Sequence, residues 1–162
     1  KIEKFLEELS SSSPTPGGGA VAALSGAMAA SLVVMVANLT LGKKGYERVQ
    51  GEVQKIKAES LTYQKHLLKL ADLDVKAFDS VMAAYRSRDK AKIRKSLKRA
   101  TDVPSKVVDL SEKVEKLAER LERIGNKNAV SDAKNAAVLA RAAQKAAEEN
   151  IKINLRTLAA LK

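Results

Sequence analysis

The chain has 162 residues, no cysteine, no tryptophan and a formal charge of +11. This length suits one domain with a single core, and the lack of cysteine excludes disulfides and thiolate metal sites. Aromatic residues make up 3% of the chain, while alanine, leucine, lysine and valine are abundant, which favours helices over sheets. We therefore expect one all-α domain over residues 1–162, a bundle of about five to six helices.

The first segment, residues 1–9, reads as a short amphipathic helix. Its apolar residues share one side, which consists of Ile2, Phe5, Leu6 and Leu9. We expect that side to dock onto the bundle. The segment lacks the pattern of a secretory signal peptide, so a cytoplasmic location is expected.

Residues 10–46 form the stretch around which the other helices are expected to pack. No charged residue occurs between Glu8 and Lys43, and the prolines and glycines of residues 14–19 predict a loop. Small and apolar residues then extend from about Gly19 to Leu41 and predict one helix that is apolar on nearly every face. Such a helix either spans a membrane or forms the centre of a soluble bundle. Its many alanines, serines and glycines favour the bundle, because they let neighbouring helices approach closely, and we expect no membrane partner.

An apolar seam with spacings of three and four residues runs from Val53 to Ala84 and predicts a long helix. Asp74 occupies a seam position, where a charge is costly to bury unless it is paired or protonated. Asp74 either caps or pairs with a neighbouring helix for structural reasons, or it is a functional carboxylate. The only histidine, His66, lies beside the seam and is expected to be solvated. No cluster of ligand residues predicts a metal site.

Much of the positive charge is local. Eight basic residues and one acid lie between Arg86 and Arg99, and we expect this segment to be a solvated connection and a short helix. No aromatic residue is interleaved with these cations to stack on bases. An anionic small-molecule tail is therefore as good a partner as a nucleic acid.

The next helix is expected to open at Val103 and Pro104, because proline suits the first turn, and to end at Ile124. The polar run GNKNAVSD, residues 125–132, then opens the last helix. It contains more capping residues than one helix start needs. The surplus is either redundant capping or a set of polar groups directed into a site.

The last helix is expected over residues 130–161. Gln144 and Asn154 interrupt its apolar seam, and Asn150 lies one turn before Asn154. Interhelical hydrogen bonds are the expected role of most of these side chains.

Together, the loops and the polar residues that interrupt the apolar seams belong to motifs that follow one another along the chain. In order, these are SPTPGGG, MVANLT, GKKGYE, DxxAF followed by VMAAY, GNKNxxSD, and INL near the end. The set resembles the cyclodeaminase/cyclohydrolase family, which includes the C-terminal domain of formiminotransferase-cyclodeaminase and stand-alone bacterial formiminotetrahydrofolate cyclodeaminases and methenyltetrahydrofolate cyclohydrolases. The resemblance spans nearly the whole chain. It implies an all-helical bundle that forms a homodimer and acts on the one-carbon unit bridging N5 and N10 of tetrahydrofolate.

The resemblance also implies the site residues. The family's motif positions fall on Phe78 and on the residues expected to form the site: catalytic Asp74 and Asp132, and substrate-binding Thr15, Pro16, Gly17, Gly18, Gly19, Asn126, Asn128 and Ser131. The glycine backbone could approach the ligand closely, and lysine and arginine side chains would receive the carboxylates of a polyglutamylated tail. The tetrahydrofolate derivative is the substrate, and neither a metal nor a tightly bound cofactor is expected.

Two reactions fit this expectation. In the cyclodeaminase reaction, our first expectation, N10 of 5-formiminotetrahydrofolate attacks the formimino carbon and ammonia leaves. In the cyclohydrolase reaction, a base activates water against the carbon of 5,10-methenyltetrahydrofolate and gives the 10-formyl product. One carboxylate with a raised pKa could serve either, and Asp74 is the expected group, with Asp132 as its partner or a pterin ligand. The alternatives from other classes are a basic nucleic-acid-binding bundle and a structural helical protein, and we expect no nucleic-acid partner.

Overall fold

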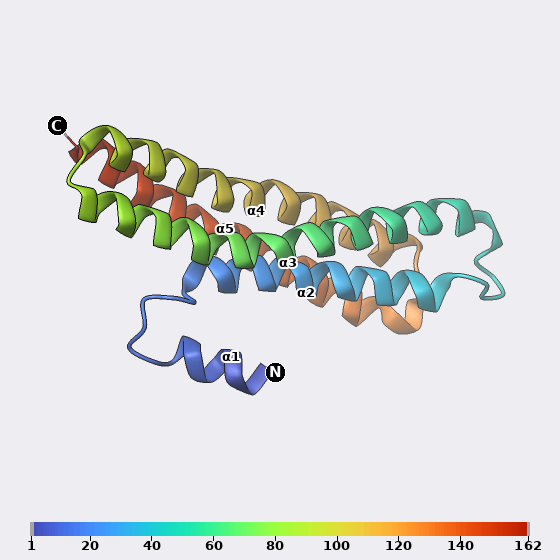
Figure 1. Ribbon diagram of the computed structural model, residues 1–162. Coiled ribbons are helices and arrows are strands. Elements are labelled where there is room, and N and C mark those ends of the chain that lie inside the picture. Colours follow the sequence, from blue (N-terminus) through green and yellow to red (C-terminus); the bar gives the residue numbers. More distant parts are fainter. Residues whose placement is uncertain (1, 162) are drawn as a thin grey trace.

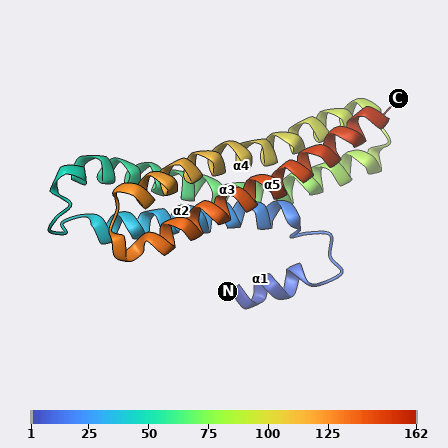
Figure 2. The ribbon, with the colours of Figure 1, turned by 180° about the vertical axis from the view of Figure 1, so that it is seen from behind.

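A computed structural model describes residues 2–161, which contain helices and no strand. The α-helices, in chain order, are α1 (Ile2–Leu9), α2 (Gly18–Thr40), α3 (Gln50–Ser87), α4 (Lys90–Ile124) and α5 (Val130–Ala160). Single turns of 3-10 helix, η1 (Glu47–Val49) and η2 (Lys127–Ala129), precede α3 and α5. Helices α2 to α5 form one elongated bundle (Figures 1 and 2). The expected all-α bundle is confirmed.

Helix α2 is the central helix, because it packs against α3, α4 and α5 and is the most buried of the four for its length, with nearly half of its residues buried. Its buried face consists mostly of alanine and valine, which keep the neighbouring helices close. At Gly26 a Cβ atom would lie 2.7 Å from Oγ of Ser111 on α4, so a larger residue would force the Ser111 side chain to shift. By length and composition α2 could cross a membrane, but 56% of its apolar window is buried inside the bundle. The expected small-residue central helix is confirmed.

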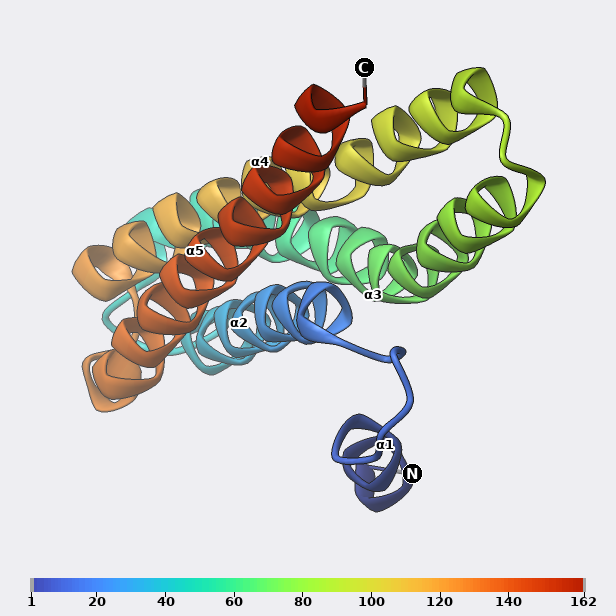
Figure 3. The same ribbon diagram turned by 90° about the vertical axis from the view of Figure 1, so that its left-hand side faces the viewer.

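The four bundle helices differ in length, and this difference creates an opening. Helix α2 has 23 residues, whereas α3, α4 and α5 have 38, 35 and 31. Beyond the start of α2 the three longer helices continue without it, and α3 and α4 diverge toward the turn that joins them (Figure 3). A small separate core of Ala84, Ile93 and Leu97 lies at that end. The space between this small core and the main core is where a site can form.

Helix α4 starts earlier than the sequence predicted. Asp89 caps it, because its carboxylate accepts hydrogen bonds from the backbone N–H groups of Ala91 and Lys92 at 2.9 and 3.1 Å. The basic segment is therefore mainly the first part of α4, and Pro104 lies buried inside the helix instead of opening it. The expected connection is reduced to residues 88 and 89, the expected solvated helix is the start of α4, and the separate helix from Val103 is wrong.

Helix α1 does not dock onto the bundle, which corrects the expectation for residues 1–9. None of its residues is buried, and Ile2 and Leu6 are 77% and 54% exposed. The loop before α2 carries α1 outside the bundle (Figure 1). Phe5 and Leu24 line a cavity of about 480 Å³ between α1 and the bundle, so that the expected apolar side faces a gap.

Candidate functional site

The opening at the start of α2 contains a cavity of about 300 Å³. Its walls come from the loop before α2, the second half of α3, the first half of α4 and the last turns of α5. Its polar side chains are Thr15, Asp74, Tyr85, Asn150, Asn154 and Thr157, and Phe78, Val81 and Leu97 are among its apolar ones. We call it the Asp74 cavity. Its volume is at the lower end of the range typical of small-molecule sites.

Asp74 lies at the first turn of α2. The N-cap residue, Gly17, has no side chain to satisfy the free backbone N–H groups, and Asp74 of α3 accepts a hydrogen bond from the N–H of Ala20. Burial raises the pKa of the Asp74 carboxyl above its usual value of 3.8, and the Ala20 hydrogen bond opposes that rise. The carboxyl is therefore both a cap for α2 and a proton-binding group in a cavity.

Gly19 explains part of the glycine motif. A methyl group at this position would overlap the Asp74 carboxylate, so only glycine allows α3 to come this close to the start of α2. Gly17 and Gly18 also line the Asp74 cavity, where their backbone is open to a ligand. Thr15 lines it as well, whereas Pro16 lines the neighbouring gap under α1.

Helix α5 supplies polar residues that the sequence analysis did not assign to the site. Asn150, Asn154 and Thr157 line the Asp74 cavity from this helix. The amide nitrogen of Asn150 is buried and has no hydrogen-bond partner, which is costly unless a ligand or water supplies one. The expected interhelical bond is found for Gln144, whose amide donates to Glu115 at 2.6 Å, but not for the amide nitrogen of Asn150. Asn150 and Asn154 are one helical turn apart, and this spacing is the sequence signal that could have identified α5 as a wall of the cavity.

The second polar motif lies at the other end of α2. Asn126 is buried there, and its amide nitrogen donates to the carbonyl of Leu39 at 2.8 Å. Its backbone N–H donates to Oγ1 of Thr40 at 2.9 Å, and its side-chain oxygen accepts from Lys43 and from the N–H of Asn128. These hydrogen bonds close this end of the bundle, and the expected role of Asn126 in substrate binding stays a prediction.

The remaining predicted residues of that motif lie at the surface. Asn128 and Ser131 are exposed, and Asp132 is half-buried in the first turn of α5. Neither Asn128 nor Ser131 caps α5, whose cap position is Ala129. The length of α2, about 35 Å, separates this end from Asp74. Within one chain the structure therefore brings Thr15, the glycines and Asp74 together, but not Asp74 and Asp132.

The basic segment lies beside the Asp74 cavity. Lys92, Lys95 and Arg99 line a cavity of about 220 Å³, and Ala77 and Ala100 line both this cavity and the Asp74 cavity. Only small side chains separate the two spaces.

Arg94 lies in the basic segment and His66 in α3. Arg94 donates to the carbonyl of Leu161 at 2.7 Å and so ties α4 to the end of α5. His66 is exposed, as expected for a solvated flank. Within residues 2–161 no group of three or more His, Asp and Glu side chains is arranged to hold a metal ion.

Comparison with known proteins places this geometry in a family. The family model described as formiminotransferase-cyclodeaminase matches residues 1–160. A methenyltetrahydrofolate cyclohydrolase of Methylorubrum extorquens is 42% identical over 97% of this chain and 80% of its own length. A formimidoyltransferase-cyclodeaminase of Rattus norvegicus is 26% identical over 97% of this chain but only 31% of its own length.

The solved structures agree. The crystal structure of a formiminotetrahydrofolate cyclodeaminase from Thermotoga maritima has a TM-score of 0.93 and 39% sequence identity, covering 97% of this chain and 79% of that one. The similarity thus extends over sequence, fold and nearly the full described length. The chain belongs to the formiminotransferase-cyclodeaminase family, which confirms the resemblance of its motifs to this group of folate enzymes.

Proposed function

We propose that this protein acts on the one-carbon unit bridging N5 and N10 of tetrahydrofolate, and that the reaction takes place in the Asp74 cavity. The observation that carries the proposal is the position of the Asp74 carboxyl at the edge of a cavity lined by glycine backbone, where burial raises its pKa. Proton transfer is what both candidate reactions need, and raising the pKa of a carboxyl brings it closer to the range in which it can both accept and donate a proton.

In the cyclohydrolase reaction, ionised Asp74 removes a proton from water as the water oxygen attacks the methenyl carbon. The proton then passes to N5 as the bond between that carbon and N5 breaks. The hydroxyl on the same carbon loses its own proton to solvent as it becomes the carbonyl, which leaves the formyl group on N10. The Methylorubrum relative carries the name of this activity. A single group thus takes and returns one proton, and no metal or tightly bound cofactor is required.

In the cyclodeaminase reaction, N10 attacks the carbon of the protonated formimino group, whose nitrogen becomes an amino group, and N10 loses its proton to Asp74. Asp74 returns the proton to the departing nitrogen, and ammonia leaves as the methenyl bridge forms. The Thermotoga structure carries the name of this activity. Both reactions pass through a tetrahedral carbon beside the same carboxyl, so we propose the shared chemistry and let the experiment decide between them.

The cavity walls suggest how the substrate is held. The unpartnered amide of Asn150 can donate to a pterin or one-carbon acceptor beside Asp74, and the backbone of Gly17 to Gly19 leaves room for a flat ring. The anionic tail would leave over Ala77 and Ala100 and reach Lys92, Lys95 and Arg99, which suits one or more glutamates. We place this reaction in the cytoplasm, where reduced folates are substrates.

A homodimer would complete the site. Met28, Met35 and Leu39 are 53%, 38% and 48% exposed, and their spacing puts them on one face of α2. If two copies associate along this face with α2 antiparallel, the end carrying Asn128, Ser131 and Asp132 of one copy meets the Asp74 cavity of the other. A twofold pair would therefore unite the two motifs that one chain keeps apart. Light scattering at micromolar concentration should give the mass of a dimer, and a monomer with full activity would contradict this arrangement.

The experiment that tests the proposed function supplies the two substrates separately. With 5-formiminotetrahydrofolate, ammonia release and the appearance of methenyl absorbance report deamination. With 5,10-methenyltetrahydrofolate, the loss of methenyl absorbance above the uncatalysed rate reports hydrolysis. Catalysis of at least one reaction is expected, and no acceleration of either by folded, dimeric protein would refute the proposal.

A further inference from the structure

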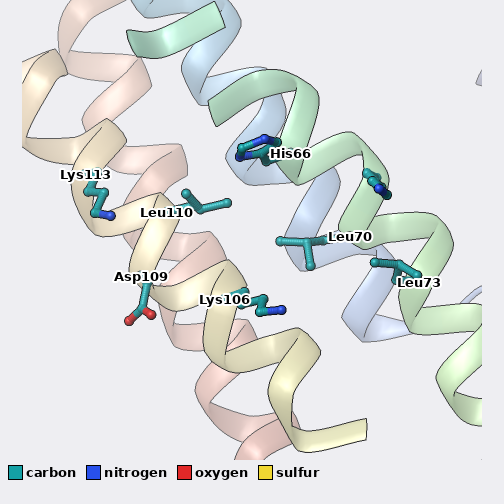
Figure 4. Close-up of a pocket in the computed structure, with 8 residues that line it drawn as sticks. His66, Leu70, Leu73, Lys106, Asp109, Leu110 and Lys113 are labelled. Atoms are coloured by element: carbon teal, nitrogen blue, oxygen red, sulfur yellow. The ribbon is translucent and has the colours of Figure 1, made fainter. Parts of the chain in front are cut away.

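A second cavity lies between α3 and α4, further toward the start of α3 than the Asp74 cavity. Its volume is about 400 Å³, and it shares no lining residue with the Asp74 cavity. Leu70, Leu73 and Leu110 form its apolar part, and its rim carries His66, Lys69, Lys106 and Lys113. Figure 4 shows His66 and Leu70 of α3 pointing toward α4, and Leu110 pointing back toward α3. We call this space the lysine groove.

The positive charge of the lysine groove is not compensated. Within residues 2–161, Lys69, Lys106 and Lys113 form no ion pair and no hydrogen bond, although Lys113 lies 5.9 Å from the ring centroid of Tyr63. Asp109 is the acid of the rim, but it points away from the space between the helices (Figure 4).

The absence of ion pairs between Asp109 and the two lysines of α4 is informative, because their spacing in the sequence would permit such pairs. Asp109 follows Lys106 by three residues and precedes Lys113 by four, which are the separations at which helix ion pairs form. At the start of α4 this kind of spacing is used, because Nζ of Lys92 lies 3.9 Å from the carboxylate of Asp89, three residues earlier. Within the described residues, three lysines therefore line the groove and none of them is paired with an acid.

The spacing of the cations defines the shape of a ligand. Seven residues separate Lys106 from Lys113 on α4, which corresponds to about 10 Å along the helix. Because α3 runs antiparallel to α4, His66 lies near the Lys113 end and Leu73 near the Lys106 end. Cations therefore stand at both ends of the groove, and leucine side chains lie between them.

We propose that the lysine groove binds a small, rod-shaped dianion with an apolar body, one anionic group lying near Lys113 and His66 and the other near Lys106. The apolar body would cover the half-buried Leu73 and Leu110, and the two anionic groups would supply the counter-charges that the lysines lack. The exposed lysines are screened by salt, so binding weakens as ionic strength rises.

Biphenyl-4,4′-dicarboxylate is a suitable test ligand, because two rings separate its carboxylates by about the required 10 Å along the helix. His66 is the only histidine of the chain, so its ring protons give one assigned NMR signal at the groove. Titration should shift that signal saturably. Biphenyl-4-carboxylate, which lacks the second anion, should bind at least tenfold more weakly. Equal affinity of the two compounds, or no saturable shift, would overturn the proposal.

A charge-matched pair of variants completes the test. Lys106→Gln/Lys113→Gln should lower the affinity for the dicarboxylate at least tenfold, whereas Lys44→Gln/Lys145→Gln, which removes the same charge from exposed positions outside the groove, should change it less than twofold. An equal loss in both variants would show that net charge alone attracts the ligand and would refute a site. Neither variant touches the Asp74 cavity, so this result is independent of the folate proposal.

Discussion

The two ends of α2 carry the two polar motifs of the chain, and they differ in how their polar groups are satisfied. At the C-terminal end, Asn126 makes hydrogen bonds with its backbone N–H, its amide nitrogen and its side-chain oxygen. At the N-terminal end, Asp74 is held in a desolvated position, and the amide nitrogen of Asn150 has no partner.

This difference separates structure from function. A buried polar group whose partners are all inside the protein stabilises the fold, whereas one that is left incomplete beside a cavity is costly to the free protein and is available to a ligand. This difference supports the proposal that the chemistry takes place at the Asp74 end, whereas the hydrogen bonds of Asn126 hold the other end of the bundle closed. Variants at the two ends should therefore have opposite effects on activity and stability.

The largest expected effect is on catalysis at the Asp74 end. Asp74→Asn keeps the shape and an oxygen that can accept the Ala20 hydrogen bond but cannot transfer the proton, so kcat should fall about 10²- to 10⁴-fold. Asp72→Asn, an exposed change two residues earlier, is the matched control and should leave kcat within twofold. Steady-state rates on both substrates give the answer, and unchanged kinetics in Asp74→Asn would remove this residue from the mechanism.

The same variant should also change how stability depends on pH. Because the folded pKa of Asp74 is raised, its protonated form contributes stability that is fully present below 3.8 and is lost as pH rises through the folded pKa. The free energy of unfolding of the wild type should fall over that interval, and Asp74→Asn should remove this fall. Urea unfolding over a pH series measures it, and identical pH dependence in both proteins would contradict the raised pKa.

The next effect is on stability at the opposite end. Asn126→Ala removes the side-chain bonds to Leu39, Lys43 and Asn128, and we expect the free energy of unfolding to fall by about 2 kcal/mol. Denaturant unfolding checks this. Asn128→Ala, an exposed neighbour, should cost less than about 0.5 kcal/mol. A loss of similar size in both variants would show that Asn126 does not close this end.

A smaller effect is expected at the incomplete amide. Asn150→Ala removes a donor that has no protein partner, so stability should be unchanged or slightly higher, while kcat/KM should fall about tenfold, the loss of one hydrogen bond to the reacting folate. Asn135→Ala, an exposed asparagine of the same helix, is the control. A fall in stability without a fall in kcat/KM would make Asn150 a packing residue.

The smallest expected effect is on the binding of the polyglutamate tail of the substrate. Replacing Lys92, Lys95 and Arg99 together by glutamine should remove a several-fold advantage in KM of polyglutamylated over monoglutamylated substrate, because these side chains are largely solvated. Turnover of the monoglutamate should persist. The control variant replaces Lys55, Lys57 and Lys145 by glutamine. If the polyglutamate preference survives the change of Lys92, Lys95 and Arg99, the tail of the substrate lies elsewhere.

Much of the architecture could be predicted from the sequence. The small residues of the uncharged run favoured a central helix over a membrane span. The spacing of apolar residues indicated the length of α3, and Asp74 was recognisable as a charge in an apolar seam. The start of α4 was missed because the dense basic run resembled a connection and Pro104 resembled a helix start. The long helix accommodates Pro104, and the sequence analysis did not consider Asp89 as a cap.

The arrangement of the site was less predictable. Motifs in one family order suggested one cluster, but the length of α2 separates Asp74 from Asp132, and only the path of the chain in space shows this. The role of Asn150 depends on the absence of a partner for one amide nitrogen, which no sequence pattern records. Only the structure could therefore show which buried polar groups lack a hydrogen-bond partner.

The most direct test of the central claim is a carbon-detected NMR titration of the Asp74 carboxyl in the folded protein, set beside the pH profile of kcat/KM. Asp74→Asn identifies the signal. The claim predicts that Asp74 titrates above its usual value of 3.8 and that kcat/KM shows an ionisation at the same pH. A carboxyl that titrates at or below 3.8, or a rate profile without an ionisation where Asp74 titrates, would contradict it.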